Sequence, residues 1–233
     1  MLLLRSVTTP PRSKLSAEAV KKFENAASGL CNIRDTSRLA TSDEDDMIYG
    51  DFTLEGVKGM YDVVNRVGGG ERKTWVDMGC GSGLVLLALK LLNPVLHVHG
   101  VEIVKPLADV ARRVMSEHAG VNVVEGDFLA NKSLWSFKEV RRAAGNSSEI
   151  YTNPASFSLS FCSFIAPQPV VVFCHSTVVF TDESMEKLGE RARGLPPGSF
   201  MVSVGRGVEG LEVVREVVGR AEWGAEIVII QKV

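Results

Sequence analysis

The chain lacks the features that would assign it quickly to several classes of protein. Its four cysteines (Cys31, Cys80, Cys162 and Cys174) are scattered and form no Cys-x-x-Cys pair, so we expect reduced, mostly buried thiols in an intracellular protein. No apolar run approaches the length of a membrane span. The 26 Lys and Arg nearly balance the 28 Asp and Glu, which argues against a compact duplex-DNA binder because such proteins are usually basic.

The N-terminus carries no clear targeting signal. Its start, Met1-Leu-Leu-Leu-Arg5, is too short for a signal-peptide core. Residues 1–17 contain Arg5, Arg12 and Lys14 and no acid, so a mitochondrial presequence is the alternative to an ordinary terminus. Because Pro10-Pro11 would interrupt the amphipathic helix that import requires, we expect an intracellular protein of the cytoplasm or nucleus.

Apolar, β-branched runs alternate with helix-like stretches, a pattern typical of a parallel sheet covered on both faces. Helices are predicted at residues 54–67, 83–92, 106–117, 135–143, 182–193 and 209–220. Strands are predicted at residues 74–78, 96–101, 121–124, 169–174, 199–204 and 225–231. Residues 145–168 have the composition of a long loop inserted at the surface. We therefore expect one α/β domain over residues 47–233. It follows an N-terminal extension, residues 1–46, that is partly disordered or helical.

A glycine-rich loop joins the strand at 74–78 to the helix that follows it. Its sequence is Asp77-Met-Gly79-Cys-Gly81-Ser-Gly83. Glycines suit a sharp turn whose backbone lies against a ligand, and the helix N-terminus that follows favours a carboxylate. The dinucleotide fingerprint G-x-G-x-x-G does not fit, because its third glycine position falls on Leu84. An acid at Asp77 would repel a pyrophosphate but can hold an ammonium group.

Two further acids stand at the ends of the next two predicted strands. Glu102, in Gly100-Val-Glu102, can accept hydrogen bonds from both hydroxyls of a ribose. Asp127, in Gly126-Asp-Phe128, can accept from an adenine amine while Phe128 lines the ring. Open α/β sheets bind ligands where such strand ends converge, so the three segments predict one nucleoside-binding crevice.

In this order and spacing, the glycine loop, Glu102 and Asp127 resemble the class I S-adenosylmethionine-dependent methyltransferases. The resemblance implies S-adenosyl-L-methionine as the cofactor. It also implies a Rossmann-like α/β fold with a seven-stranded, mostly parallel, doubly wound sheet and an antiparallel last strand. No metal is expected, since His97 and His99 face one side of a strand without a third ligand at usable spacing.

A narrower resemblance comes from Tyr49-Gly50-Asp51, just before the first predicted helix of the domain. With the glycine loop, Glu102 and Gly126-Asp-Phe-Leu129, it is similar to the disruptor-of-telomeric-silencing family, the non-SET histone-lysine methyltransferases. The resemblance implies that Tyr49 and Gly50 belong to a flap over the cofactor. Asp51 departs from the family, which has Glu at this position.

The same resemblance covers the end of the strand predicted at 169–174. His175 and Ser176 stand where the family has paired asparagines, one of which contacts the cofactor. Tyr49, His175 and Ser176 are therefore the candidates for substrate-side and positioning roles. The chain departs from the family's larger members because it has neither a helical domain before the catalytic fold nor a basic segment for nucleosomal DNA.

These features make a protein-lysine methyltransferase the leading hypothesis. Its partner would be a protein with an accessible lysine, and the acidic run Asp43-Glu-Asp-Asp46 would attract a basic one; the simpler interpretation of that run is a solvated loop. No nucleic-acid or membrane partner is expected. Two alternatives stay open: a methyltransferase for RNA or a small molecule, and a cofactor-binding module without turnover, suggested by the absence of the paired asparagines at His175-Ser176.

Overall fold

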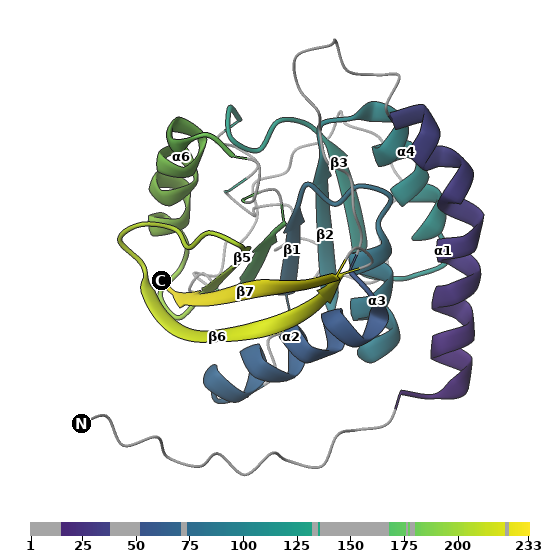
Figure 1. The fold of residues 1–233 in the computed structure, drawn as a ribbon, viewed down its shortest axis with the longest axis horizontal. Helices are drawn as coiled ribbons and strands as arrows, with labels where there is room; N and C mark the ends of the chain where they lie inside the picture. Colours follow the sequence, from purple (N-terminus) through teal and green to yellow (C-terminus); the bar gives the residue numbers. More distant parts are fainter. Residues whose placement is uncertain are drawn as a thin grey trace, which may run out of the picture.

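The core of the chain is a seven-stranded sheet with helices on both faces (Figure 1). The computed structural model describes residues 15–37, 52–70, 74–131, 135, 168–175, 177, 180–221 and 224–233. The strand order is β3-β2-β1-β4-β5-β7-β6. Strands β3 to β5 of this order are parallel, and β7 runs antiparallel to both of its neighbours. The predicted fold class is confirmed.

Apart from α1 and β6, the elements lie close to the predicted ranges. The strands are β1 (Thr74–Met78), β2 (His97–Glu102), β3 (Val121–Glu125), β4 (Val171–Cys174), β5 (Phe200–Val204), β6 (Glu212–Ala221) and β7 (Gly224–Lys232). The helices are α1 (Ala17–Ser37), α2 (Leu54–Val67), α3 (Leu84–Leu92), α4 (Lys105–Val114) and α6 (Asp182–Arg193). The predicted helix at 135–143 lies outside the described residues except for Trp135, and the predicted insertion at 145–168 lies outside them except for its last residue.

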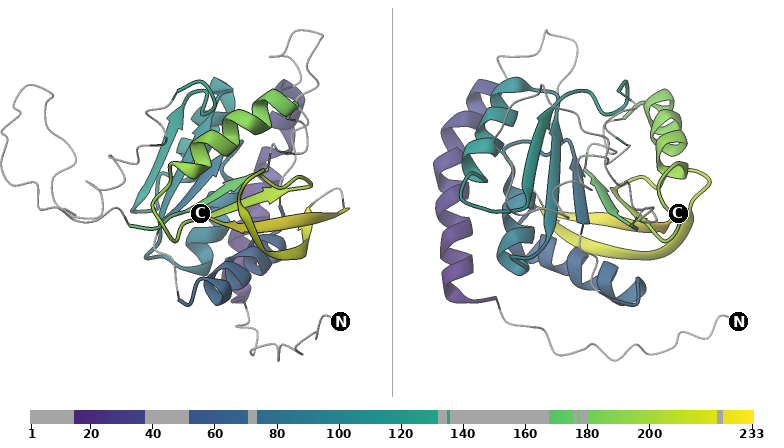
Figure 2. Two further views of the ribbon diagram at one scale, coloured as in Figure 1. Left: turned by 90° about the vertical axis from the view of Figure 1, so that its left-hand side faces the viewer. Right: turned by 180° about the vertical axis from the view of Figure 1, so that it is seen from behind.

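Two apolar layers hold the helices against the sheet. On one face, α2, α3 and part of α4 pack on the side that carries Trp75, Phe173 and Val202. On the other face, α6 packs on the side that carries Val172 and Met201. The helices that accompany β1 to β3 cover one face of the sheet, and α6, which follows β4, covers the other. The point at which the strand order reverses direction, the switch point, therefore falls between β1 and β4. Figure 2 shows the two layers from the side and from behind.

Helix α1 forms an additional layer outside this sandwich. It packs against α3 and α4 rather than against the sheet (Figure 1). Its buried side chains, including Phe23 and Leu30, join the same apolar layer as α2 and α3. In the part of the chain that the structure describes, no helix is both long enough and apolar enough to cross a membrane.

The prediction of a helix at residues 209–220 is wrong. Residues 212–221 form β6, the strand at the edge of the sheet next to β7. Valine pairs at 213–214 and 217–218 are four residues apart, which imitates a helical repeat. In the structure a bulge between Val213 and Arg215 breaks the strand's alternation. Val214 and Val217 contact the core, while Val213 and Val218 remain 51% and 74% exposed. β-Branched residues favour an extended backbone, and pairing with β7 decides the outcome.

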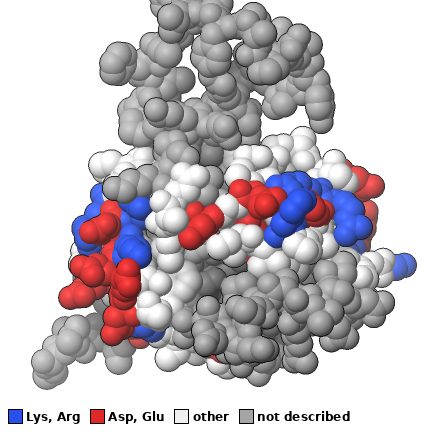
Figure 3. All heavy atoms as spheres, turned by 90° about the horizontal axis from the view of Figure 1, so that it is seen from above, with Lys and Arg blue, Asp and Glu red and all other residues white. Residues whose placement is uncertain are grey.

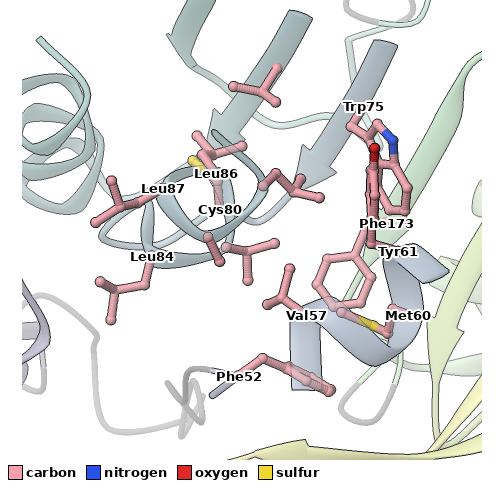
Figure 4. Close-up of a cluster of buried hydrophobic side chains, with 14 of the residues drawn as sticks. Phe52, Val57, Met60, Tyr61, Trp75, Cys80, Leu84, Leu86, Leu87 and Phe173 are labelled. Carbon is pink, nitrogen blue, oxygen red and sulfur yellow. The ribbon is translucent and has the colours of Figure 1, made fainter. Parts of the chain in front are cut away.

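The glycine-rich loop packs tightly against β2. Cys80 is buried among Leu84, Leu86 and Leu87 at the start of α3 (Figure 4). An added Cβ at Gly100 would lie 2.6 Å from Cys80 Sγ and 2.8 Å from Leu86 Cδ1. Glycine at position 100 thus allows the loop and α3 to approach the sheet closely.

We therefore expect Gly100→Ala to destabilise the protein by about 1–3 kcal/mol, because the loop or the strand must move to admit one methyl group. Thermal unfolding followed by circular dichroism should show a clearly lower midpoint. Gly29→Ala in α1 is the matched control, since its added methyl would meet nothing within 4 Å and alanine favours a helix. Equal midpoints for Gly100→Ala and the wild type would contradict this account of the packing.

Candidate cofactor site at the strand ends

The carboxyl ends of four neighbouring strands meet at the switch point. Met78, the last residue of β1, pairs with Val101 of β2 and with Cys174 of β4. The glycine loop, the end of β2 and His175 therefore leave the sheet side by side. With strands spaced about 4.8 Å apart, the four ends from β3 to β4 span about 14 Å. This is the crevice in which open α/β sheets bind ligands.

The glycine loop is held in place by backbone hydrogen bonds. Gly79, Gly81 and Gly83 have φ values of 86°, 52° and 86°, a left-handed conformation that side-chain-bearing residues rarely adopt. The N–H groups of Gly79 and Cys80 both donate to the Val101 carbonyl, at 2.8 and 3.0 Å. Gly83 then caps α3. The predicted loop is confirmed as the connection that turns from β1 into a buried helix.

Glu102 is the buried acid of the site. Its side chain is 5% exposed; Oε2 accepts the Gly81 N–H at 2.8 Å and Oε1 accepts the Val104 N–H at 2.8 Å. Burial raises the pKa of this carboxyl, although the hydrogen bonds from Val104, Gly81 and Ile103 act in the opposite direction. Each carboxylate oxygen keeps further acceptor capacity, so Glu102 can hold the loop and still accept hydroxyl groups.

Asp77 lies in β1, two residues before Gly79, the first glycine of the loop. It is 2% exposed and occupies the fourth position of β1. Burial, followed by the charges of Asp77 and Glu102, raises the pKa of the Cys80 thiol well above its usual value. Both carboxylates therefore lie close to Cys80. A thiol held protonated in this way is an inert filler and a poor nucleophile.

Asp127 and Phe128 follow β3, but their side chains serve the local turn and the core. Asp127 is exposed, and its Oδ1 accepts the N–H groups of Leu129 and Ala130 at 2.8 and 3.0 Å. Phe128 is only 8% exposed and packs against Phe180, with ring centroids 6.0 Å apart. A direct role of either residue toward an adenine stays a prediction.

Ile103 is a candidate that the sequence analysis missed. It directly follows Glu102 and is 55% exposed, whereas its neighbour Val104 is tied to the Glu102 carboxylate. An exposed isoleucine at this strand end provides an apolar surface on which a flat ring can lie. The sequence contains no signal for it, because an apolar residue after a buried strand is indistinguishable from the strand's continuation.

His175 stands at the other end of the crevice and is half-buried. Its imidazole stacks on Phe173, with centroids 6.4 Å apart and an interplanar angle of 11°. Phe52, which sequence analysis did not single out, meets His175 edge-on at 5.2 Å. Tyr49, Gly50, Asp51 and Ser176 lie outside the described residues, so their roles stay predictions.

In the described residues, neither a group of metal ligands nor the surface charge points to a particular ligand. No group of three or more His, Cys, Asp or Glu side chains in them has an arrangement that can hold a metal ion. Burial and the neighbouring His97 lower the pKa of His99 to about 4, which keeps that imidazole neutral. On the face drawn in Figure 3, acidic and basic side chains lie next to one another. Several ion pairs of the described residues lie within one helix, such as that of Lys105 with Asp109.

Comparisons with known proteins bear on the fold. No protein-family model matches the chain, and no curated protein sequence matches it either. Among solved structures, the chain is similar to a "putative methyltransferase" from Thermobifida fusca, with a TM-score of 0.53 at 13% identity over 76% of this chain and 78% of that one. At this identity the similarity shows a common fold and leaves the substrate open.

Two other solved structures are similar at lower TM-scores. One is an RNA methyltransferase from Salinibacter ruber in complex with S-adenosyl-L-homocysteine, with a TM-score of 0.45 and 16% identity over 77% of this chain and 88% of that one. The other is the plantazolicin methyltransferase BpumL, with a TM-score of 0.45 and 16% identity over 80% of this chain and 59% of that one. The chain thus has an α/β fold shared with the Thermobifida protein.

Proposed function

We propose that this chain binds S-adenosyl-L-methionine at the strand ends and is a methyltransferase. The observation that carries the proposal is the buried Glu102 carboxylate, which is bonded to the glycine loop and lies level with it at the switch point. Glu102 would accept the ribose hydroxyls, and Asp77 would hold the ammonium of the methionine moiety. When bound, the cofactor supplies a methyl group already activated on a sulfonium.

The protein's own contribution would be alignment and the exclusion of water. A nucleophile must approach the methyl group to about 3–3.5 Å along the line of the breaking bond. The loop backbone would lie against the cofactor because Gly79 and Gly81 carry no side chain. Gly83 instead lets the loop approach α4, since an added Cβ there would lie 3.0 Å from Ala111 Cβ. Ile103 would cover one face of the adenine. A bulkier loop would hold the nucleoside too far from the sheet for the carboxylates to reach it.

We further propose a protein lysine as the methyl acceptor, in line with the resemblance of Tyr49-Gly50-Asp51 to the flap of the non-SET histone-lysine methyltransferases. The near-neutral net charge of −2 and the mixed charges of Figure 3 favour a protein over a nucleic acid. A lysine must lose its proton before transfer, and a desolvated channel lowers its pKa. This acceptor assignment is separate from the proposal about the cofactor.

The proposal is tested by incubating the protein with cofactor labelled on the methyl group and with a cell lysate. We expect label in protein, and methyl-lysine after acid hydrolysis. The Glu102→Gln variant is the negative control, since its labelling should fall with its cofactor affinity. Label found only in RNA or in small molecules would contradict the lysine acceptor while supporting methyl transfer. Cofactor binding without transfer to any acceptor would instead indicate a non-catalytic binding module.

The cofactor site makes a prediction about two acids. Glu102→Gln and Asp77→Asn should each weaken binding of S-adenosylhomocysteine roughly tenfold or more, because hydrogen bonds to charged groups contribute about 1.5–3 kcal/mol each. Calorimetry measures the affinity, and circular dichroism should show an unchanged fold. Glu117→Gln is the matched control, since Glu117 is an exposed acid just before β3, at the opposite edge of the sheet. Unaltered affinity in both variants would remove the site from this crevice.

The raised pKa of Glu102 gives the binding a pH dependence of definite sign. Hydroxyl donors favour the ionised carboxyl, so cofactor binding must lower this pKa and release a proton at acid pH. We expect affinity to increase as pH rises from the usual carboxyl value of 4.5 through the raised pKa, and then to level off. Glu102→Gln should show a flat profile over the same range. Wild-type affinity that falls with rising pH would refute this role for Glu102.

A further inference from the structure

Phe52 occupies a socket that two glycines leave open. Its side chain is 1% exposed, although it stands outside the regular elements, just before α2. A Cβ added at Gly219 in β6 would lie 2.8 Å from Phe52 Cε1 and 2.7 Å from Val228 Cγ2 of β7. One added at Gly56 in α2 would lie 3.1 Å from Phe52 Cδ1 but only 2.2 Å from the Arg220 carbonyl oxygen. A larger residue at position 219 would therefore press on the ring, whereas one at position 56 would first separate α2 from β6.

The other side of the same ring meets the end of β4. Phe52 makes edge-on contacts with Phe173, at 5.6 Å and 88°, and with His175, at 5.2 Å and 81°. Phe173 and His175 are themselves stacked. Edge-to-face contacts at such separations are favourable and depend on direction, so the three rings restrain one another's orientation. Figure 4 shows Phe52 beside the core cluster that contains Phe173.

The backbone fastens Phe52 to the edge of the sheet. Phe52 forms an antiparallel bridge with Ala221 of β6. The N–H and the hydroxyl of Thr53 both donate to the Arg220 carbonyl, at 3.1 Å each. The same hydroxyl accepts the N–H of Gly56 and so caps α2. One short segment therefore joins β6, the start of α2 and the end of β4.

His175 connects this segment to the proposed cofactor site. Because Met78 pairs with Cys174, His175 leaves the sheet next to Gly79, the first glycine of the loop. The backbone of His175 is thus beside the glycine loop, while its imidazole contacts Phe52. Phe52 also follows Tyr49-Gly50 by two residues in the sequence.

We propose that Phe52 is a positioning residue of the cofactor site: its ring sets the orientation of the His175 imidazole and thereby couples β6 to the crevice. The proposal rests on the proposed function, since the site it positions is the one assigned to S-adenosyl-L-methionine. A ring that served only the hydrophobic core would affect stability alone. A positioning ring also changes cofactor affinity and the surroundings of His175.

The sharpest test moves Phe52 without changing it or any residue of the site. Gly219→Ala places a methyl group against the ring from the β6 side. We expect the dissociation constant of S-adenosylhomocysteine to rise roughly fivefold or more, the lower end of typical coupling between sites. The imidazole signals of His175 should shift in the nuclear magnetic resonance spectrum. They are assigned among the protein's four histidines by their loss in His175→Gln.

Gly59→Ala is the matched control, because its added methyl on α2 meets nothing within 4 Å. It should leave both the affinity and the His175 signals unchanged. Phe52→Leu is the second variant, to be used if Gly219→Ala does not fold: leucine keeps apolar volume in the socket but removes the ring edge. It should have the same two effects. All affinities are measured well below the melting midpoint of each variant.

The outcomes separate the two proposals. A lower melting midpoint with unchanged affinity and unchanged His175 signals would make Phe52 a core residue only, and would overturn the inference. Shifted His175 signals without a change in affinity would overturn it as well, since the coupling would not reach the cofactor. Failure of the wild-type protein to bind S-adenosylhomocysteine would remove the proposed function, and this inference with it. That result is obtained before any variant is made.

Discussion

The hydrogen bond between the Glu102 carboxylate and the Gly81 N–H is the contact on which the site depends. It joins the end of β2 to the loop after β1, so the two strand ends behave as one rigid edge. Burying a carboxylate is costly unless it is well bonded, and Glu102 has N–H donors on both oxygens. Burial raises the pKa of this carboxyl while its hydrogen bonds act in the opposite direction, so the bonds offset part of the cost. Further hydroxyl donors would therefore stabilise the ionised Glu102 carboxylate.

Close packing beneath the loop keeps this edge in place. Cys80 lies against Gly100, where even one methyl group would overlap its sulfur, and α3 buries almost every side chain that follows. Because interiors of this density do not deform continuously, the glycine loop, Asp77 and Glu102 have a fixed relation to one another. Preorganisation of this kind is what a site must supply when the reactive group is carried by the cofactor.

The far end of the crevice is built differently. There the His175 ring contacts the rings of Phe173 and Phe52. Phe52 in turn depends on Gly56 and Gly219, which are more than 160 positions apart in the sequence. The antiparallel β6–β7 hairpin, which exposes Val218 and Ile227, is thus connected to the end of β4 through Phe52.

The sequence by itself determined the glycine loop, the acid after β2 and the alternation of strands and helices, because each depends on local spacing and on backbone conformations that only certain residues adopt. It also placed α2 and α6 correctly, and in the structure Thr53 and Thr181 cap them. Only the tertiary structure decided the rest. Residues 212–221 have valines at helical spacing, yet pairing with β7 makes them a strand. Phe128 follows the turn at Gly126-Asp127, yet its ring packs against Trp135 and Phe180 in the core. Phe52 acquires its contacts from β4, α2 and β6, which no local pattern can reveal, because packing between distant segments is set by the shape of the space they leave.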